Sequence, residues 1–174
     1  MLGAAKEEVE IAGRYPGGSF SWVVLLSQCR RWLTHWLPVI VWMTLIFMAS
    51  SDSESGPRGS RILAPLIRWV APGLSATEVD AIVFFVRKVA HFWEYGVLAV
   101  LLLRALSAGQ AGRWQWRTVG WALLGTAAYA ASDEFHQAFV PTRVASITDV
   151  VIDTSGGAAA LAVWWGVRRV MRWR

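Results

Sequence analysis

The sequence predicts an all-α, polytopic integral membrane protein with four transmembrane helices and an interfacial helix after the first. Hydrophobic residues fill 55% of the 174 positions, and the mean hydropathy of +0.40 exceeds that of ordinary soluble domains. The apolar residues gather into four segments of about membrane length, separated by loops rich in Gly, Ser, Pro and charged residues. Basic residues flank these segments instead of forming long runs, so we expect membrane lipids as partners and no nucleic acid.

The first transmembrane span is expected over residues 32–50, which carry no formal charge. At ~1.5 Å per residue, this segment approaches the ~30 Å thickness of the hydrocarbon core. Pro38 lies within it and is tolerated where neighbouring groups satisfy the freed carbonyl. Residues 1–30 before it are predicted to form a cytoplasmic tail, and residues 31–174 the membrane domain.

The second span is predicted to follow a polar loop. Residues 51–73 are rich in Ser, Gly, Pro and charged side chains, and residues 62–70 within them are expected to lie along the interface. Ser75 and Glu78 then stand at the spacing of a capping box, which marks the start of a long helix. The membrane portion of this helix is expected over residues 87–106.

The third span is expected over about residues 118–135 and the fourth over residues 147–167. Ionisable residues end the third apolar segment after only fifteen positions, so either the helix continues with these side chains facing the protein or the bilayer is locally thin. Ser146 and Asp149 have capping-box spacing at the start of the fourth span. Glycines and alanines from Gly156 onward permit close helix packing in lipid.

The charge distribution predicts that both termini are cytoplasmic, since positive residues are retained on that side. The predicted inner segments hold eleven Lys/Arg and three Asp/Glu, a net charge of +8, whereas the outer segments hold six and nine, a net charge of −3. Tryptophans at the predicted membrane interfaces fit aromatic belts, with Trp32, Trp36, Trp114, Trp116 and Trp173 inside and Trp69 and Trp93 outside.

This topology brings ionisable residues of the last three spans to the outer membrane face. They are Lys88, His91, Glu94 and Tyr95 on the second span, Asp133, Glu134, His136 and Gln137 on the third, Arg143 in the connecting loop, and Asp149 and Asp153 on the fourth. Spacings of three, four and seven residues place the members from each span largely on one helix face. Because each ionisable group at membrane depth costs roughly 2.5 to 3.5 kcal/mol, the cluster indicates a function.

Each member also has a structural explanation when taken alone. Asp149 can act as half of a capping box. Lys88 can extend to the outer head groups, and Arg143 can contact a lipid phosphate. His91 and His136 can be hydrogen-bonded structural histidines. The grouping of these residues, more than any one of them, favours a site.

The same residues resemble the VanZ-like family. The most specific stretch is DEFHQAFVPTRVASITDVVIDTSGG, KVAHFWEYG supports it independently, and the resemblance covers about residues 40–166. Ser50 and Ser51 match more weakly, and Ser155 stands where the family more often has leucine. The resemblance implies a multi-pass protein of the bacterial cytoplasmic membrane. A named relative in this family contributes to low-level resistance to teicoplanin, a lipoglycopeptide that acts outside that membrane. The resemblance does not imply a known reaction.

With neutral histidines, the formal charge of the cluster is −3. This negative charge must be offset by protons on the carboxylates, by imidazolium or by a divalent cation, which is the candidate cofactor. One hypothesis is an enzyme acting on an amphiphilic or lipid-linked small molecule by acid–base or metal-assisted hydrolysis. Its catalytic residues would be His91, Glu94, Asp133, Glu134 and His136, and its substrate contacts Lys88, Tyr95, Gln137, Arg143, Asp149 and Asp153. The alternative is a non-catalytic protein that binds or shields a glycopeptide or lipid-linked precursor.

Overall fold

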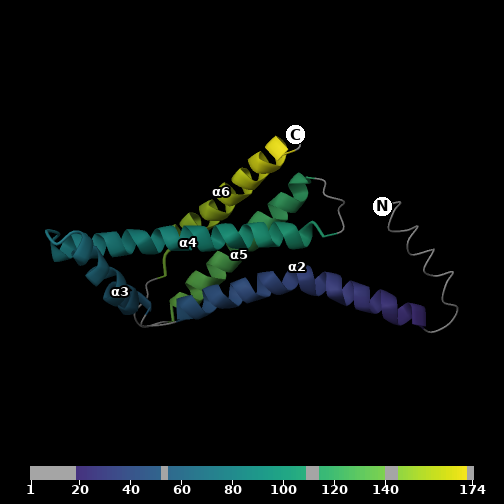
Figure 1. Cartoon of the computed structure of the whole chain (residues 1–174), viewed down its shortest axis with the longest axis horizontal. Helices are drawn as coiled ribbons and strands as arrows, with labels where there is room; N and C mark the ends of the chain where they lie inside the picture. The colour runs from purple at the N-terminus through teal and green to yellow at the C-terminus, as the bar shows by residue number, and fades with distance from the viewer. Residues whose placement is uncertain (1–18, 52–54, 109–113, 140–144, 172–174) are drawn as a thin grey trace.

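The computed structural model describes residues 19–51, 55–108, 114–139 and 145–171. Within these ranges it contains α-helices and no β-strand, which confirms the all-α prediction (Figure 1). The helices are α2 (Ser19–Ser51), α3 (Ser55–Val70), α4 (Ala76–Leu106), α5 (Trp116–Gln137) and α6 (Ile147–Met171).

The start of α4 confirms the capping box predicted from sequence. The Ser75 hydroxyl accepts a hydrogen bond from the Glu78 amide at 3.3 Å, and the Glu78 carboxylate accepts one from the Ser75 amide at 2.8 Å. These two bonds satisfy amides that have no partner within a helix end. The helix then runs without interruption to Leu106, where the predicted second span ends.

Three helices are longer than the spans predicted within them. α2 begins at Ser19 instead of residue 32, so the later part of the predicted tail is helical, whereas residues 1–18 lie outside the described residues. α6 continues to Met171, four residues beyond the predicted end. α5 extends to Gln137 and therefore passes its ionisable residues in helical form, which decides between the two alternatives for the third segment.

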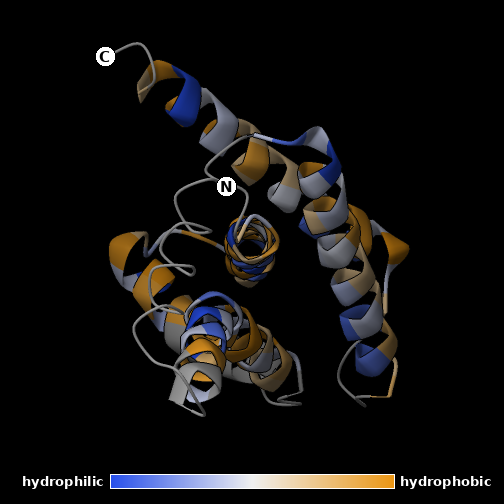
Figure 2. Cartoon of the chain, turned by 90° about the vertical axis from the view of Figure 1, so that its right-hand side faces the viewer, coloured by the Kyte–Doolittle hydropathy of each residue, from blue (hydrophilic) through white to orange (hydrophobic). Residues whose placement is uncertain are grey.

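α4 is the central helix of the molecule and contacts α2, α3, α5 and α6 (Figures 1 and 2). Its most extensive contact is with α6, and glycines explain how closely these two helices approach. A Cβ atom added at Gly156 would lie 2.1 Å from the carbonyl oxygen of Phe92, so only glycine fits there. One at Gly96 would lie 3.3 Å from the Cβ of Ala160, as expected for small residues between membrane helices.

Large hydrophobic side chains are far more often exposed than buried in the described residues. The buried core is small and centres on Tyr95 and Leu98 of α4, whereas large apolar side chains on the described helices are exposed. Three segments, Val24–Ser50, Ala76–Leu106 and Ile147–Met171, are long and apolar enough to cross a membrane. This distribution suits a lipid surrounding and is consistent with a membrane protein.

Candidate functional site

Asp133 lies at the centre of a buried polar network that joins three helices. Its Oδ2 atom accepts hydrogen bonds from the Ser50 hydroxyl at 2.6 Å, from the Tyr95 hydroxyl at 3.2 Å and from the Gln137 amide at 3.0 Å. Gln137 Nε2 also donates to Ser50 Oγ at 3.0 Å. Because Ser50 comes from α2, Tyr95 from α4, and Asp133 and Gln137 from α5, this carboxylate ties the three helices together.

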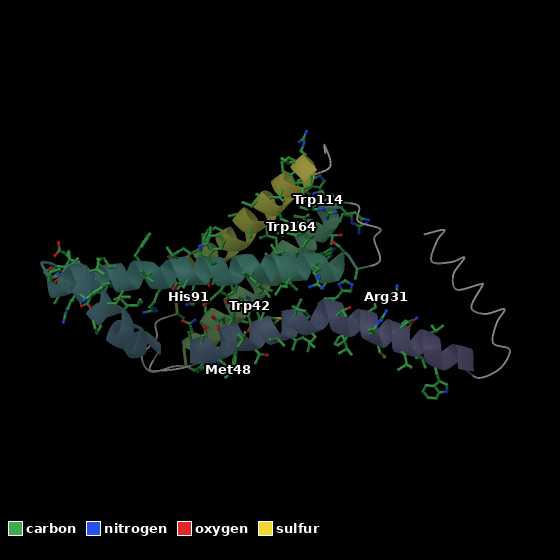
Figure 3. All side chains as sticks on the ribbon, viewed as in Figure 1. Arg31, Trp42, Met48, His91, Trp114 and Trp164 are labelled. Carbon is green, nitrogen blue, oxygen red and sulfur yellow. The ribbon has the colours of Figure 1, made fainter. Side chains whose placement is uncertain are left out.

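A second buried carboxylate, Asp153, lies on α6 facing His91 of α4. The distance from His91 Nδ1 to Asp153 Oδ2 is 3.8 Å, within ion-pair range if the imidazole is protonated. Asp153 is only 1% exposed, whereas about a fifth of the His91 side chain is accessible. Figure 3 shows His91 where α4 passes the end of the other helices, far from Trp114. The imidazole therefore contacts a buried carboxylate on one side and is accessible from outside the helices on the other.

Each of the two buried aspartates has one oxygen without a hydrogen-bond partner in the described structure. These atoms are Oδ1 of Asp133 and Oδ2 of Asp153. A buried polar atom left unpaired costs free energy, so such atoms usually face a water, an ion or a ligand. Because Oδ2 of Asp153 is the atom that faces His91 Nδ1, it is Oδ1 of Asp133 that indicates a place for a further polar group.

Glu94 is a half-buried acid of the cluster. It lies close enough to His91, Asp153 and Asp133 to interact electrostatically with all three. Its backbone carbonyl accepts a 2.9 Å hydrogen bond from the Trp42 indole of α2, which fixes this turn of α4 against α2. Glu94 and His91 are thus half-buried ionisable groups that interact with the buried aspartates.

The start of α6 differs from the predicted capping box. The Ser146 amide donates to Oε2 of Glu134 at 2.8 Å, and the Asp149 carboxylate forms an ion pair with the Lys88 ammonium. Asp149 is therefore engaged by the neighbouring helix α4. As a result, Lys88 is held at the side of the cluster and does not extend alone toward the head groups.

His136 has a ring contact with α2. Its ring lies 4.7 Å, centroid to centroid, from the ring of Phe47 on α2, and so it packs at the α2–α5 contact. Arg143, the remaining predicted cation, lies outside the described residues. Of the predicted residues, Tyr95, Asp133 and Gln137 share direct hydrogen bonds, and His91 and Asp153 face each other.

Ser50 is the site residue that the sequence prediction missed. It is 2% exposed and bonds both Asp133 and Gln137, although it comes from the first span, which was given no site residue. A serine ending an apolar span is common, so its burial cannot be inferred from composition. The weak family match at this position was the only sequence feature that pointed to it.

The described residues hold no group of three His, Cys, Asp or Glu side chains arranged to bind a metal ion. Chemically, the arrangement offers an imidazole and a carboxylate that are partly accessible, backed by two buried carboxylates. Such a set can accept, hold and donate protons and can bind a polar or cationic group.

A family model described as VanZ/LLP1 matches residues 35–170 of the chain. This range includes Ser50 and all the predicted site residues on the four long helices. No curated protein and no solved structure matches the chain.

Proposed function

This chain belongs to the VanZ/LLP1 family, and from that premise we propose a multi-pass protein of the bacterial cytoplasmic membrane whose polar cluster faces outward. The four spans are α2, α4, α5 and α6, with α3 along the outer interface and both termini in the cytoplasm. The 22 residues of α5 cover ~33 Å at ~1.5 Å per residue, enough for the hydrocarbon core. The charge bias of the loops supports the orientation.

The function proposed for the cluster is acid–base hydrolysis at the polar head of an amphiphilic molecule in the outer leaflet. The molecule is a lipid-linked envelope precursor or a lipoglycopeptide, which would change the response to such antibiotics. The observation that carries this proposal is the partly accessible His91 facing the buried Asp153, next to Glu94 and to Oδ1 of Asp133, which has no hydrogen-bond partner among the described residues. Burial makes such a group costly unless it meets a ligand.

In this mechanism His91 takes a proton from the attacking water, and Asp153 holds the imidazole in place and stabilises its positive form. Glu94 gives a proton to the leaving group. Asp133 acts through position, since its network fixes α5 against α2 and α4. Lys88 and Arg143 are the cations proposed to bind an anionic head group. A divalent cation bound near His91 and Asp153 is the other means of offsetting the negative charge, and metal analysis of the purified protein tests it.

The test compares lipid extracts and teicoplanin susceptibility of bacterial cells with and without the gene. Once mass spectrometry identifies a lipid-linked species that changes, its turnover is measured with purified protein in vesicles. His91→Asn and Glu94→Gln are each expected to reduce turnover by about 10² to 10⁴-fold, the usual contribution of general acid–base groups.

The matched control is Asp80→Asn, which neutralises an exposed carboxylate on the same helix. This variant should keep full turnover. The proposal fails if no lipid species changes with the gene, or if both cluster variants turn over the species as fast as the control does.

Binding without turnover is the second candidate, and the burial of Asp133 and Asp153 favours it. Deeply buried carboxylates hold a ligand or a fold in place more readily than they reach a reacting bond. In that case Glu94→Gln protein retains the same lipid or glycopeptide on purification, and cells carrying it keep the wild-type antibiotic response. No product would appear with either protein.

A further inference from the structure

A groove of about 470 Å³ runs along the junction of α4 and α6, outside the polar cluster. Its walls include Trp93, Val97 and Leu101 from α4 and Ala159, Val163 and Trp164 from α6. The lining residues are glycine, alanine, valine, leucine, phenylalanine and tryptophan, so none of them carries a charge. The volume lies in the range typical of small-molecule sites in proteins.

The groove follows from the close packing of α4 on α6. Gly96 and Gly156 belong to its lining and allow the two backbones to approach closely. Because glycine has no side chain, the floor of the groove lies deeper than the larger side chains on its two walls. Trp93 is 65% exposed and Val163 67%, which leaves the groove open along its side. In a membrane that side faces the hydrocarbon of the lipids.

One end of the groove meets the polar cluster. Phe92, in its lining, directly follows His91, and Gly156 lies three residues after Asp153. The contacts of Gly156 with Phe92 and of Gly157 with Ala99 show that the two helices run in the same direction. The groove therefore leads away from the cluster, toward Trp164 (Figure 3).

The length of the groove corresponds to one leaflet. Along α4 its lining extends from Phe92 to Leu101, a rise of ~14 Å at ~1.5 Å per residue, which is about half of the ~30 Å hydrocarbon thickness. A hydrocarbon chain that starts at the cluster would thus end near the middle of the bilayer.

We propose that this groove holds an acyl chain of a membrane lipid whose head group lies in the polar cluster. The inference rests on the function proposed above and names its substrate class: a lipid that enters sideways from the outer leaflet. Two independent features adjoin here: an apolar groove of leaflet depth and, beyond the Phe92–Gly156 end of that groove, the pair of His91 and Asp153, whose imidazole is partly accessible.

Photocrosslinking tests the occupant directly. The full chain is placed in vesicles of phosphatidylethanolamine and phosphatidylglycerol, together with a phosphatidylglycerol that carries a diazirine at the end of one acyl chain. After irradiation, mass spectrometry is expected to find crosslinks several-fold enriched on Val97–Leu101 and Ala159–Val167. The reference is the exposed apolar surface of α2 at Leu37, Val41 and Leu45, which contacts lipid without a groove.

Two variants of neighbouring alanines locate the binding. Ala159→Trp fills the groove and should lower the groove crosslinks to the level seen on α2. Ala158→Trp adds the same bulk to an exposed position of α6 that does not line the groove, and should leave them unchanged. Equal labelling of the groove and α2, or equal labelling in both variants, overturns the proposal. So do crosslinks joining two copies of the chain through these residues, because they assign the groove to a dimer contact.

The Glu94→Gln variant tests the lipid groove separately from the proposed acid–base chemistry. Glu94→Gln removes an acid–base group without changing the groove, so its groove crosslinks should equal those of the wild type even where turnover is lost. Groove labelling together with undiminished turnover in Glu94→Gln would uphold the lipid site and reject the proposed mechanism.

Discussion

At the scale of single residues, Asp133 has the most connections of any side chain in the cluster. Its Oδ2 atom accepts from Ser50, Tyr95 and Gln137, and the residue is 2% exposed. Hydrogen bonds to a charged acceptor are stronger than neutral ones, and a buried carboxylate depends on them. Removing a single donor should therefore affect the stability of the whole helix bundle.

Ser50→Ala is expected to lower the free energy of unfolding by about 1 to 2 kcal/mol, because Asp133 and Gln137 each lose a partner in a buried setting. Thermal unfolding of the purified protein in one detergent measures the effect. Ser132→Ala is the matched control, since the Ser132 hydroxyl is exposed and bonds only to Tyr129 of its own helix. Equal melting temperatures of the two variants would contradict a stabilising role of Ser50.

The ion pair between Lys88 and Asp149 gives a second residue-level prediction. Lys88→Glu places two negative charges together and should destabilise the protein by roughly 1 to 3 kcal/mol, between the values for exposed and buried pairs. Adding Asp149→Lys to the same chain should restore part of the loss, as measured by thermal unfolding. Asp80→Lys, at an exposed position of α4, should have little effect. If the double variant is no more stable than Lys88→Glu, the pair does not stabilise the protein.

Helical spacing predicted part of this network correctly. Asp133 and Gln137 lie one turn apart, and the structure confirms that they share a face. The same spacing placed His136 beside them, and its ring contacts Phe47 of the neighbouring helix α2. Spacing along one helix cannot show which neighbour lies opposite, and for the same reason Ser50 was missed.

At the scale of helices, the contact of α4 with α6 depends on positions without side chains. A Cβ at Gly156 would lie 2.1 Å from the Phe92 carbonyl, whereas Gly166, on the same helix, has no atom within 4 Å of its Cβ position. The sequence predicted close packing near Gly156 but not the partner helix. Helix α5 extends two residues beyond each end of the predicted third span, and its continuation past the ionisable residues is one of the two alternatives that the sequence left open.

Gly156→Ala is expected to push α6 away from α4 and to cost at least about 1 to 3 kcal/mol, as overpacking does. Gly166→Ala serves as its control and should be neutral or stabilising by up to about 1 kcal/mol, because alanine favours the helix. Both melting temperatures are measured under identical conditions. A Gly156→Ala protein as stable as Gly166→Ala would show that the two backbones are not in close contact.

At the scale of the whole molecule, the apolar surface was the most predictable feature. Exposed hydrophobic side chains cover the helices, as the composition indicates. Three of the described helices contain a segment with the length and hydropathy of a membrane span. α5 is not among these three. Its last turns carry Asp133, Glu134 and Gln137, all of them buried, so average hydropathy underestimates a helix whose polar groups face inward.

The proposed topology predicts how two cysteines react with a membrane-impermeant maleimide in spheroplasts. Cys29, the single cysteine, is exposed near the start of α2 and should be labelled only after permeabilisation. In a Cys29→Ser background, Thr77→Cys at the start of α4 should be labelled in intact spheroplasts. The reverse pattern would invert the orientation, and labelling of both cysteines in intact spheroplasts would remove the span over residues 32–50.

The direction of the hydrogen-bond network along the chain bears on how the protein is made. Asp133 follows Ser50 and Tyr95 in sequence, and Asp153 follows His91; the ion pair between α4 and α6 has the same order. Since synthesis proceeds from the amino terminus, each of these aspartates is made after its partner on an earlier helix, whereas Gln137, which also donates to Asp133, follows four residues later on the same helix. In the proposed topology, the acidic residues would therefore reach helices that already carry Ser50, Tyr95, His91 and Lys88.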